Sequence, residues 1–390
     1  MNHPDSLKLL LNRIQQRAVI VGVVALALCG VGAYLAPDQF FQSYLLGYLF
    51  WIGIALGSLA IVALHHLVGG GWGFTIQRLL ESSTRTLPLM AVLFLPFFFG
   101  MEKLYLWARP EMVAGDELLQ HKAPYLNVSF FWMRAAGYFL LWTTFAFLIN
   151  KWSREQDRTA EPSLTRRLQS ISGPTLVVYV LTVTFAAMDW VMSLDPHWFS
   201  TIYGLIFVVG QALATLAFAV VVVGALAKHP PLSEVMAAKH FHDLGNLLLA
   251  FVMLWAYISF SQFLIIWSVN LPEEIPWYVH RLHGGWEWIA LILLVFQFAL
   301  PFVLLLSRQT KRRAEILVKV AMAIVFMRLV DLFWLVAPNF HPEAFAIHWM
   351  DVLAPVGIGG IWITVFVWHL KGVTLLPLHD PRLQEAFHHE

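Results

Sequence analysis

Six ionisable side chains lie inside long apolar stretches of this sequence and are the first candidates for chemistry. They are Glu102, Arg134, Asp189, Glu287, Arg328 and Asp331. A charged side chain inside a bilayer costs at least about 2.5–3.5 kcal/mol on insertion scales, so such residues are expected to have ionic partners, water or a function. The pattern predicts either ion pairs that hold helices in register or groups that handle protons.

The spacing of these residues indicates which of them can form ion pairs within one helix and which are better suited to handling protons. Glu102 and Asp189 have no basic residue three or four positions away. An acid in a low-dielectric region without a local cation is suited to taking up and releasing a proton. Arg328 and Asp331 are three residues apart and can pair on one helix face. Arg134 can meet either Asp189 or Glu102 across a helix bundle, and the sequence leaves that choice open.

Further titratable residues gather at the ends of the apolar stretches. At one set of ends lie Asp195, His197, His280, His283, His341, His348 and Asp351, and at the other lie His65, His66, His240, His242 and Asp243. Histidine titrates near neutral pH. The second set is therefore interpreted as interfacial histidines that face water or lipid headgroups. The alternative is that this set and the acids at the other ends of the runs form the two ends of a proton route.

Ten apolar runs must position these residues. They are Ala18–Ala36, Gln42–Val68, Leu87–Ala108, Asn127–Asn150, Thr175–Leu194, Thr201–Ala227, Leu244–Val269, Gly284–Leu306, Ile316–Ala337 and Val352–Leu370. A helix needs about 20 apolar residues to cross about 30 Å of hydrocarbon. The runs lack the alternation of strands, so helices are expected to hide their backbone polar groups. The sequence predicts an all-α polytopic membrane protein with ten transmembrane helices.

Composition and charge agree with a membrane location. Hydrophobic residues make up 59% of the chain and charged residues 13%, against about 25% charged in soluble domains. With the amino terminus taken as cytoplasmic, most of the 25 Lys and Arg residues lie inside, and only Lys103, Arg109, Lys122 and Arg281 lie outside. This bias predicts that both termini are cytoplasmic. The net charge of +1 gives no support to a nucleic-acid role.

Intrinsic redox centres are not expected. The single cysteine, Cys29, cannot build a Cys-based zinc site or an Fe–S cluster, so no metal site is predicted. Almost all of the 16 histidines lie at interfaces or in loops, which argues against a haem held within the bilayer. The first run is followed at once by Pro37 and is interpreted as a retained anchor, not a signal peptide.

Between the runs, three stretches are expected outside the hydrocarbon. Gly69–Pro88 is predicted to be cytoplasmic with a short amphipathic helix around Ile76–Glu81, and Lys151–Pro174 to be a charged cytoplasmic segment. Arg109–Leu126 is predicted to lie on the outer side.

A weak internal repeat relates runs two to five to runs six to nine. The fifth run ends in Asp189-Trp190, and the ninth carries Asp331 three residues before Trp334. Corresponding runs cross in the same direction, which indicates parallel repeats. We therefore predict one integral membrane domain, residues 1–390. It comprises four-helix bundles at 42–194 and 201–337 and peripheral helices at 18–36 and 352–370.

Three motifs carry a resemblance to a known family. The segments Met188–Gly204, Phe241–Leu247 and His280–Trp286 are similar to the ActF-type membrane subunits of bacterial alternative complex III. More broadly, the whole chain resembles the NrfD/PsrC superfamily of quinol-oxidising membrane subunits, in which the fold is two four-helix bundles with two flanking helices.

The resemblance implies a function and a setting. It implies a subunit of a quinol:cytochrome c, or quinol:electron acceptor, oxidoreductase in the bacterial inner membrane. The implied partners are a homologous ActC-like membrane subunit, periplasmic subunits with Fe–S clusters and c-type haems, small membrane subunits, lipids and a terminal oxidase. A quinone would bind near Asp189, Trp190 and His197, and Asp189 and Asp195 would handle protons. Haem and Fe–S groups are expected only on the partner subunits.

Two alternatives stay open. The chain could be a redox-inactive subunit that supports a homologous quinol-oxidising neighbour. A secondary transporter ranks third, because transporters place substrate on broken helices near the midplane, whereas the polar groups here gather at one end of the runs.

Overall fold

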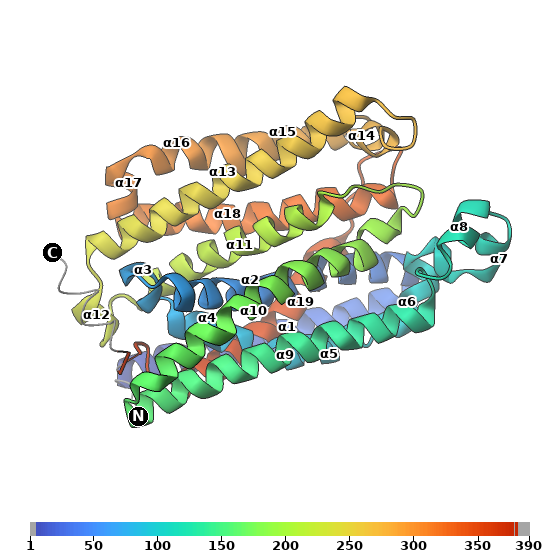
Figure 1. The fold of residues 1–390 in the computed structure, drawn as a ribbon. Coiled ribbons are helices and arrows are strands. Elements are labelled where there is room, and N and C mark those ends of the chain that lie inside the picture. The colour runs from blue at the N-terminus through green and yellow to red at the C-terminus, as the bar shows by residue number, and fades with distance from the viewer. Residues whose placement is uncertain (1–4, 378, 381–390) are drawn as a thin grey trace.

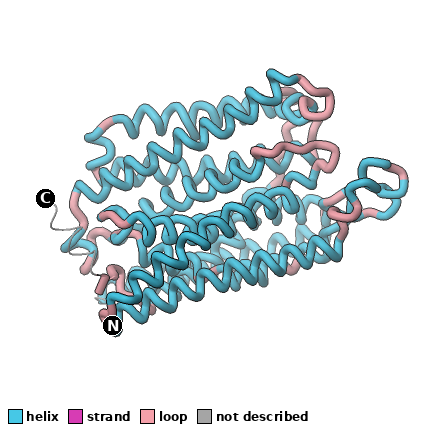
Figure 2. The backbone as a smooth tube through the Cα atoms, viewed as in Figure 1, coloured by secondary structure: helices cyan, strands magenta, loops and turns pink. Residues whose placement is uncertain are grey.

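The computed structural model describes residues 5–377, 379 and 380, and within them the chain is all-α. Long helices run side by side along one direction (Figure 1), and the loops gather at the two ends of the molecule (Figure 2). In this described part, nine helices are long and apolar enough to cross a membrane, and a bent pair provides a tenth candidate. The predicted class, an all-α polytopic membrane protein, is confirmed.

The long helices correspond to the apolar runs. They are α1 Asp5–Leu35, α2 Pro37–Val68, α9 Val128–Thr159, α10 Pro162–Trp190, α11 Tyr203–Leu226, α13 Ala238–Val269, α18 Ala314–Val336 and α19 Trp349–Lys371. The eighth run folds as α15 Trp286–Ile292, the π-helical η3 Leu293–Ala299 and α16 Leu300–Leu306. The third run folds as α5 Leu87–Phe94, α6 Phe97–Leu104 and η1 Leu106–Ala108.

Short helices join the long ones. They are α3 Gly71–Phe74, α4 Gln77–Thr84, α7 Pro110–Ala114, α8 Glu117–Lys122, η2 Met192–Leu194, α12 Leu232–Val235, α14 Pro276–Arg281, α17 Arg308–Arg312 and η4 Ala337–Asn339. We call the end of the molecule where α1 begins and α19 ends the terminal end. The opposite end carries α6, α7, α8 and α14 (Figure 1).

The third run corrects the prediction of a straight span. Gln77–Phe94 and Phe97–Leu104 meet at an angle of 66°. Pro96 lies at the break, where its ring removes a backbone donor and crowds the preceding turn. The short helix predicted around Ile76–Glu81 is present as α4, but all eight of its residues are buried, so it is not the surface amphipathic helix that the sequence predicted. The polar side chains of α4 tolerate burial because other buried polar groups bind them, as described below.

The predicted charged segment Lys151–Pro174 is also mostly helical. α9 continues to Thr159 and α10 begins at Pro162, which leaves only Ala160 and Glu161 between them. Ala160 has a left-handed backbone (φ 53°) that ends α9. The apolar pattern located the membrane portion of each helix, whereas backbone hydrogen bonding extends the helices beyond it.

Packing places α2 at the centre. It contacts α10, α11, α18 and α19, as well as the α4–α6 segment. In the most apolar stretch of α2, 94% of the residues are buried inside the protein, whereas in the most apolar stretch of α1 only 22% are buried. α1 lies along α19, where a Cβ on Gly22 would fall 2.8 Å from the backbone nitrogen of Ile361. Small residues of this kind let two membrane helices approach closely.

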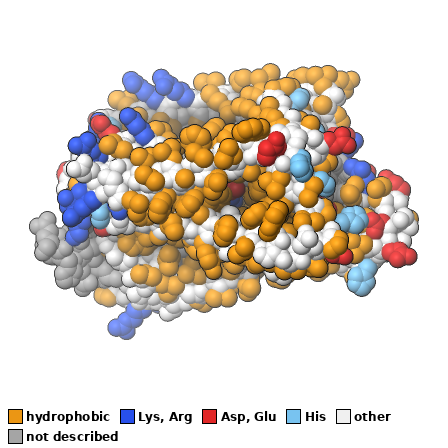
Figure 3. All heavy atoms as spheres, turned by 90° about the horizontal axis from the view of Figure 1, so that it is seen from above, with side chains coloured by type: hydrophobic (Ala, Val, Ile, Leu, Met, Phe, Trp, Pro, Cys, Tyr) orange, Lys and Arg blue, Asp and Glu red, His pale blue; other side chains and the backbone are white. Residues whose placement is uncertain are grey.

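Charge is distributed unevenly over this frame. Basic side chains gather at one end of the molecule and acidic and histidine side chains at the other, with an apolar belt between them (Figure 3). The described ends of the chain lie together, since Lys371 Nζ binds Gln15 Oε1 across α19 and α1. The arrangement is that of a multi-pass membrane protein whose polar ends flank its apolar middle.

Candidate functional site

Asp189 lies near the end of α10 and is bound by α9. Arg134 Nε donates to Asp189 Oδ2 and Arg134 Nη2 to Oδ1, both at 2.9 Å. Tyr138, one helical turn after Arg134, donates its hydroxyl to Oδ2 at 2.9 Å. The Asp189 side chain is 1% exposed. This bidentate, charge-assisted geometry is the strong form of an arginine–carboxylate pair, and it decides that Arg134 meets Asp189 and not Glu102.

The chain around Asp189 is fixed by neighbouring aromatic residues. Tyr105 donates its hydroxyl to the carbonyl of Trp190 at 3.0 Å, and Trp107 donates to the carbonyl of Ser193 at 3.2 Å. On the opposite side, the Arg134 guanidinium lies 3.9 Å from the centre of the Tyr125 ring. Arg134 is therefore held in place by hydrogen bonds and by a cation–π contact.

The segment after Asp189 contacts the α7–α8 protrusion. His197 Nε2 lies 2.6 Å from Asp116 Oδ2, and Asp116 also accepts from the backbone amides of Leu118 and Leu119 at the start of α8. The hydrogen bond from His197 is the main cause that lowers the pKa of Asp116 below its ordinary value of 3.8. Asp195 is half-buried in the same turn, and Lys122 Nζ binds the carbonyl of Pro196 at 2.5 Å.

A cavity of about 450 Å³ lies beside this segment. Its walls include Lys122, Tyr125, Met188, Ser193 and Trp198. The predicted quinone position near Asp189, Trp190 and His197 therefore borders a real cavity. None of those three residues lines it, because Trp190 is buried, Asp189 is closed by Arg134, and His197 turns to Asp116.

A second buried ion pair lies on α18. Arg328 Nη1 binds Asp331 Oδ2, as the three-residue spacing predicts, and Trp255 of α13 donates to the same oxygen at 3.2 Å. Both acid and base are about 3% exposed. The guanidinium packs directly on Gly210 of α11. The pair therefore joins α11, α13 and α18.

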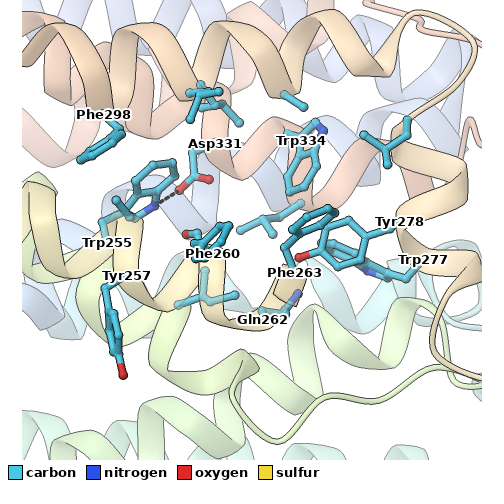
Figure 4. Close-up of a pocket in the computed structure, with 18 of the residues that line it drawn as sticks. Trp255, Tyr257, Phe260, Gln262, Phe263, Trp277, Tyr278, Phe298, Asp331 and Trp334 are labelled. Carbon is cyan, nitrogen blue, oxygen red and sulfur yellow. Dashed lines mark hydrogen bonds between the residues drawn. The ribbon is translucent and has the colours of Figure 1, made fainter. Parts of the chain in front are cut away.

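A cavity of about 700 Å³ opens beside Asp331. Its walls come from α13, α14, α15–η3 and α18. The side chains that converge on it are mostly aromatic: Trp255, Phe260, Phe263, Trp277, Tyr278, Phe298 and Trp334 (Figure 4). Seen from the α13 side, the apolar surface has a recess with charged atoms at its floor (Figure 3). Asp331 is the one acid among the lining residues.

At the terminal end, a third buried cluster centres on Arg78 of α4. Arg78 binds Glu81 Oε2 at 2.6 Å and both oxygens of Asp157 of α9 at 2.6 Å. Ser153 donates to Glu81 Oε1 at 2.6 Å, and Gln77 donates to the same oxygen. These contacts explain why α4 folds into the protein interior.

Buried polar side chains continue from this cluster toward Asp331. The hydroxyls of Ser83 of α4 and Ser58 of α2 lie 2.9 Å apart, and Ser58 can give its one proton either to Ser83 or to the carbonyl of Ile54. Thr215 of α11 also donates to the carbonyl of Ile54.

One turn before Thr215, Gln211 accepts from Tyr179 of α10 at 2.9 Å. Gly210, the residue before Gln211, packs against the guanidinium of Arg328. We call Glu81, Ser83, Ser58, Thr215, Gln211, Tyr179, Arg328 and Asp331 the polar line.

Glu102 and the two predicted interface residues His283 and Glu287 lie away from these clusters. Glu102 is exposed, so the argument from burial does not apply to it, and its backbone carbonyl accepts from Arg109. His283 is exposed, and Glu287 accepts from the amide of Gly285 at 2.8 Å, where it caps α15.

The histidines of the terminal end divide into two kinds. His65 and His66 are fully buried, which corrects the interpretation of both as interfacial residues facing water or headgroups. The ring of His65 contacts Trp72 and Phe74 edge-on. His242 and Asp243 are half-buried and 3.7 Å apart.

The described residues contain no group of three or more His, Cys, Asp or Glu placed to hold a metal ion. The fold and these clusters define a class, the polytopic α-helical membrane protein with buried ion pairs and an aromatic cavity. No family model matches the chain, and no curated protein matches it.

Several residues of the site were missed from the sequence. Arg78 and Glu81 were placed in a short amphipathic helix and Asp157 in a charged segment, both outside the hydrocarbon, although the three-residue spacing of Arg78 and Glu81 is a pairing signal. Gln211 and Gln262 lie in apolar runs, where a lone amide was a signal that could have been used. Tyr138 gave a further signal, because it follows Arg134 by one turn.

Proposed function

We propose that this chain is an ActF-like integral membrane subunit of a respiratory quinol:electron acceptor oxidoreductase, and that it supports quinol oxidation by transferring protons. The observation that carries the proposal is the polar line, a row of buried polar side chains from Glu81 to Asp331 in which Ser58–Ser83, Tyr179–Gln211 and Arg328–Asp331 are hydrogen-bonded pairs. It lies between a buried ion cluster at the terminal end and the wall of a large aromatic cavity. A membrane protein with no need to move protons or ions gains little from such a line, because each buried polar group costs desolvation energy.

The chemistry of the line suits proton transfer. A hydroxyl group can donate one hydrogen bond and accept another, so Ser58, Thr215 and Tyr179 are side chains of a kind that can pass a proton. Glu81 and Asp331, at the two ends, can hold the proton. Arg328 and Arg78 stabilise the ionised forms of these acids through direct bonds.

Interruption of the line tests the proposal. In the purified complex, Gln211→Leu and Tyr179→Phe are expected to lower quinol turnover or proton release at least several-fold, because each removes the hydrogen bond between Tyr179 and Gln211 in the polar line. Glu102→Gln is the matched control, since this acid is exposed and outside the line. Unchanged turnover and proton release in assembled Gln211 and Tyr179 variants would contradict the proposal.

A redox-inactive structural role is the second candidate. The observation that favours it is the closed state of Asp189, both of whose oxygens are bound by Arg134 and one also by Tyr138. Under this interpretation, Asp189→Asn lowers the thermal stability of the assembled complex and leaves turnover and proton release unchanged. Loss of turnover in an Asp189→Asn complex of wild-type stability excludes it.

A further inference from the structure

The cavity beside Asp331 contains buried hydrogen-bond donors without partners. Gln262 of α13 lines the cavity and is 1% exposed; its side chain lies beside the Tyr278 hydroxyl, but its Nε2 forms no hydrogen bond of normal geometry with the described residues. The indole nitrogen of Trp334 of α18, another lining residue, is likewise buried without a partner. A buried donor left unsatisfied costs about 1–3 kcal/mol, so two beside one cavity indicate that a ligand with acceptor oxygens satisfies them.

The carboxylate of Asp331 adds an acceptor to the same wall. Arg328 and Trp255 both donate to Oδ2. Oδ1 receives no bond from the described residues and is available to a ligand hydroxyl. The cavity therefore combines two donors with one acceptor, which matches a ring compound that carries carbonyl oxygens in one state and hydroxyls in another.

The shape of the cavity fits a flat ring with an apolar tail. Its walls are aromatic and its volume of about 700 Å³ lies in the range of small-molecule sites. Its rim carries exposed apolar side chains, among them Tyr257, Phe260 and Leu294. A tail can leave the cavity along this rim and continue into the apolar belt of the molecule (Figure 3).

The charges exclude a phosphate headgroup. The lining residues include no Lys or Arg. Arg281, on the neighbouring helix α14, gives its donors to the carbonyls of Trp277, Trp334 and Leu335 and to Asn339. An anionic phosphate beside Asp331 would therefore lack a free cation to neutralise it.

We propose that this cavity binds the ring of a quinone or quinol, with Gln262 and Trp334 donating to ring oxygens and Asp331 accepting from a ring hydroxyl. The choice of quinones among such ring compounds rests on the proposed function. This position lies between α13, α14 and α18, away from the predicted site near Asp189, Trp190 and His197.

The test uses the full chain purified in detergent. The probe is a photoreactive azido-quinone with a ten-carbon tail, mapped by peptide mass spectrometry and competed with decylubiquinone. We expect labels on lining peptides of α13, α14 or α18. Gln262→Leu and Trp334→Phe are each expected to weaken competition about 3- to 10-fold, the effect of one hydrogen bond. Ala256→Phe, which fills the cavity from α13, is expected to abolish labelling.

Two control variants keep the test specific. Trp132→Phe removes a buried indole donor without a partner on α9, outside the cavity. Met188→Phe narrows the smaller cavity beside Tyr125. Both should label as the wild type does. Loss of labelling in Met188→Phe with retention in Ala256→Phe would overturn the site, as would competition by added phospholipid but not by decylubiquinone.

Failure of this site differs from failure of the proposed function. If labelling is absent while the Gln211 and Tyr179 variants of the complex lose turnover or proton release, the site is wrong and the function stands. If the site is labelled and those variants retain both activities, the site stands and the proposed proton transfer is wrong.

Discussion

Arg134 and Asp189 lie 55 positions apart in the sequence and are joined by two parallel hydrogen bonds of 2.9 Å between α9 and α10. Tyr138 adds a third bond to the same carboxylate. The side chains are 10% and 1% exposed. The pair therefore fixes the relative position of two helices near the end of the molecule that carries the acidic residues.

Removal of one partner of this pair should destabilise the protein strongly. Asp189→Ala leaves the Arg134 guanidinium buried without its counter-ion, and the free energy of unfolding is expected to fall by about 3–5 kcal/mol. Thermal unfolding in detergent measures the effect. The double variant Arg134→Met/Asp189→Leu removes both charges and should recover most of the loss. A double variant no more stable than Asp189→Ala would contradict this account.

A methyl group on Gly210 should disturb the second ion pair. An added Cβ would fall 2.7 Å from Arg328 Nη2, so the guanidinium must shift away from its bond with Asp331. We expect Gly210→Ala to cost about 1–3 kcal/mol, as overpacking of a filled interior does. Gly137→Ala is the control, because a Cβ there meets nothing within 4 Å. Equal unfolding temperatures for the two variants would refute the prediction.

The Arg78 cluster should matter far more than a surface ion pair. Arg78→Met leaves Glu81 and Asp157 buried without their shared cation, and about 3–5 kcal/mol of stability should be lost. Lys8→Met serves as the comparison. Lys8 pairs with Asp5 at 3.7 Å, but both are exposed, so its loss should cost at most about 1 kcal/mol. Similar chemical-denaturation curves for both variants would show that the cluster is not stabilising.

The contact between Asp116 and His197 should make the α7–α8 protrusion sensitive to acid. The folded protein holds the pKa of Asp116 below 3.8, chiefly through the bond with His197. The resulting stabilisation is present above the ordinary aspartate pKa and is lost as the pH falls through the lower pKa of the folded state. Pepsin should therefore cleave α7–α8 faster relative to the rest of the chain as the pH falls from 4 toward 2.

Asp116→Asn provides the comparison for this acid effect. The amide cannot ionise, so the relative rate of cleavage in α7–α8 should change little over the same pH interval. An identical pH dependence in the wild type and in Asp116→Asn would show that another group controls the segment.

The sequence predicted the fold class well because its dominant signal is long apolar runs, and hydrocarbon permits few backbone structures. It also predicted the Arg328–Asp331 pair, which depends only on the geometry of one helix. It failed for the third run, which Pro96 bends, and for the burial of α4, whose helix it predicted but whose polar composition is typical of a surface segment. Burial of α4 depends on Asp157 and Ser153 of a distant helix, and local composition does not encode such contacts.

The candidate site, too, was predicted from the sequence only in part. The sequence by itself determined that charged residues occur within apolar helices and that they cluster toward one end. Only the tertiary structure decided that Asp189 is closed by Arg134, that Glu102 is exposed, and that Gln262 and Asp331 share an aromatic cavity. The physical reason is that hydrophobicity acts residue by residue along the chain, whereas hydrogen bonds and cavities depend on which helix faces meet.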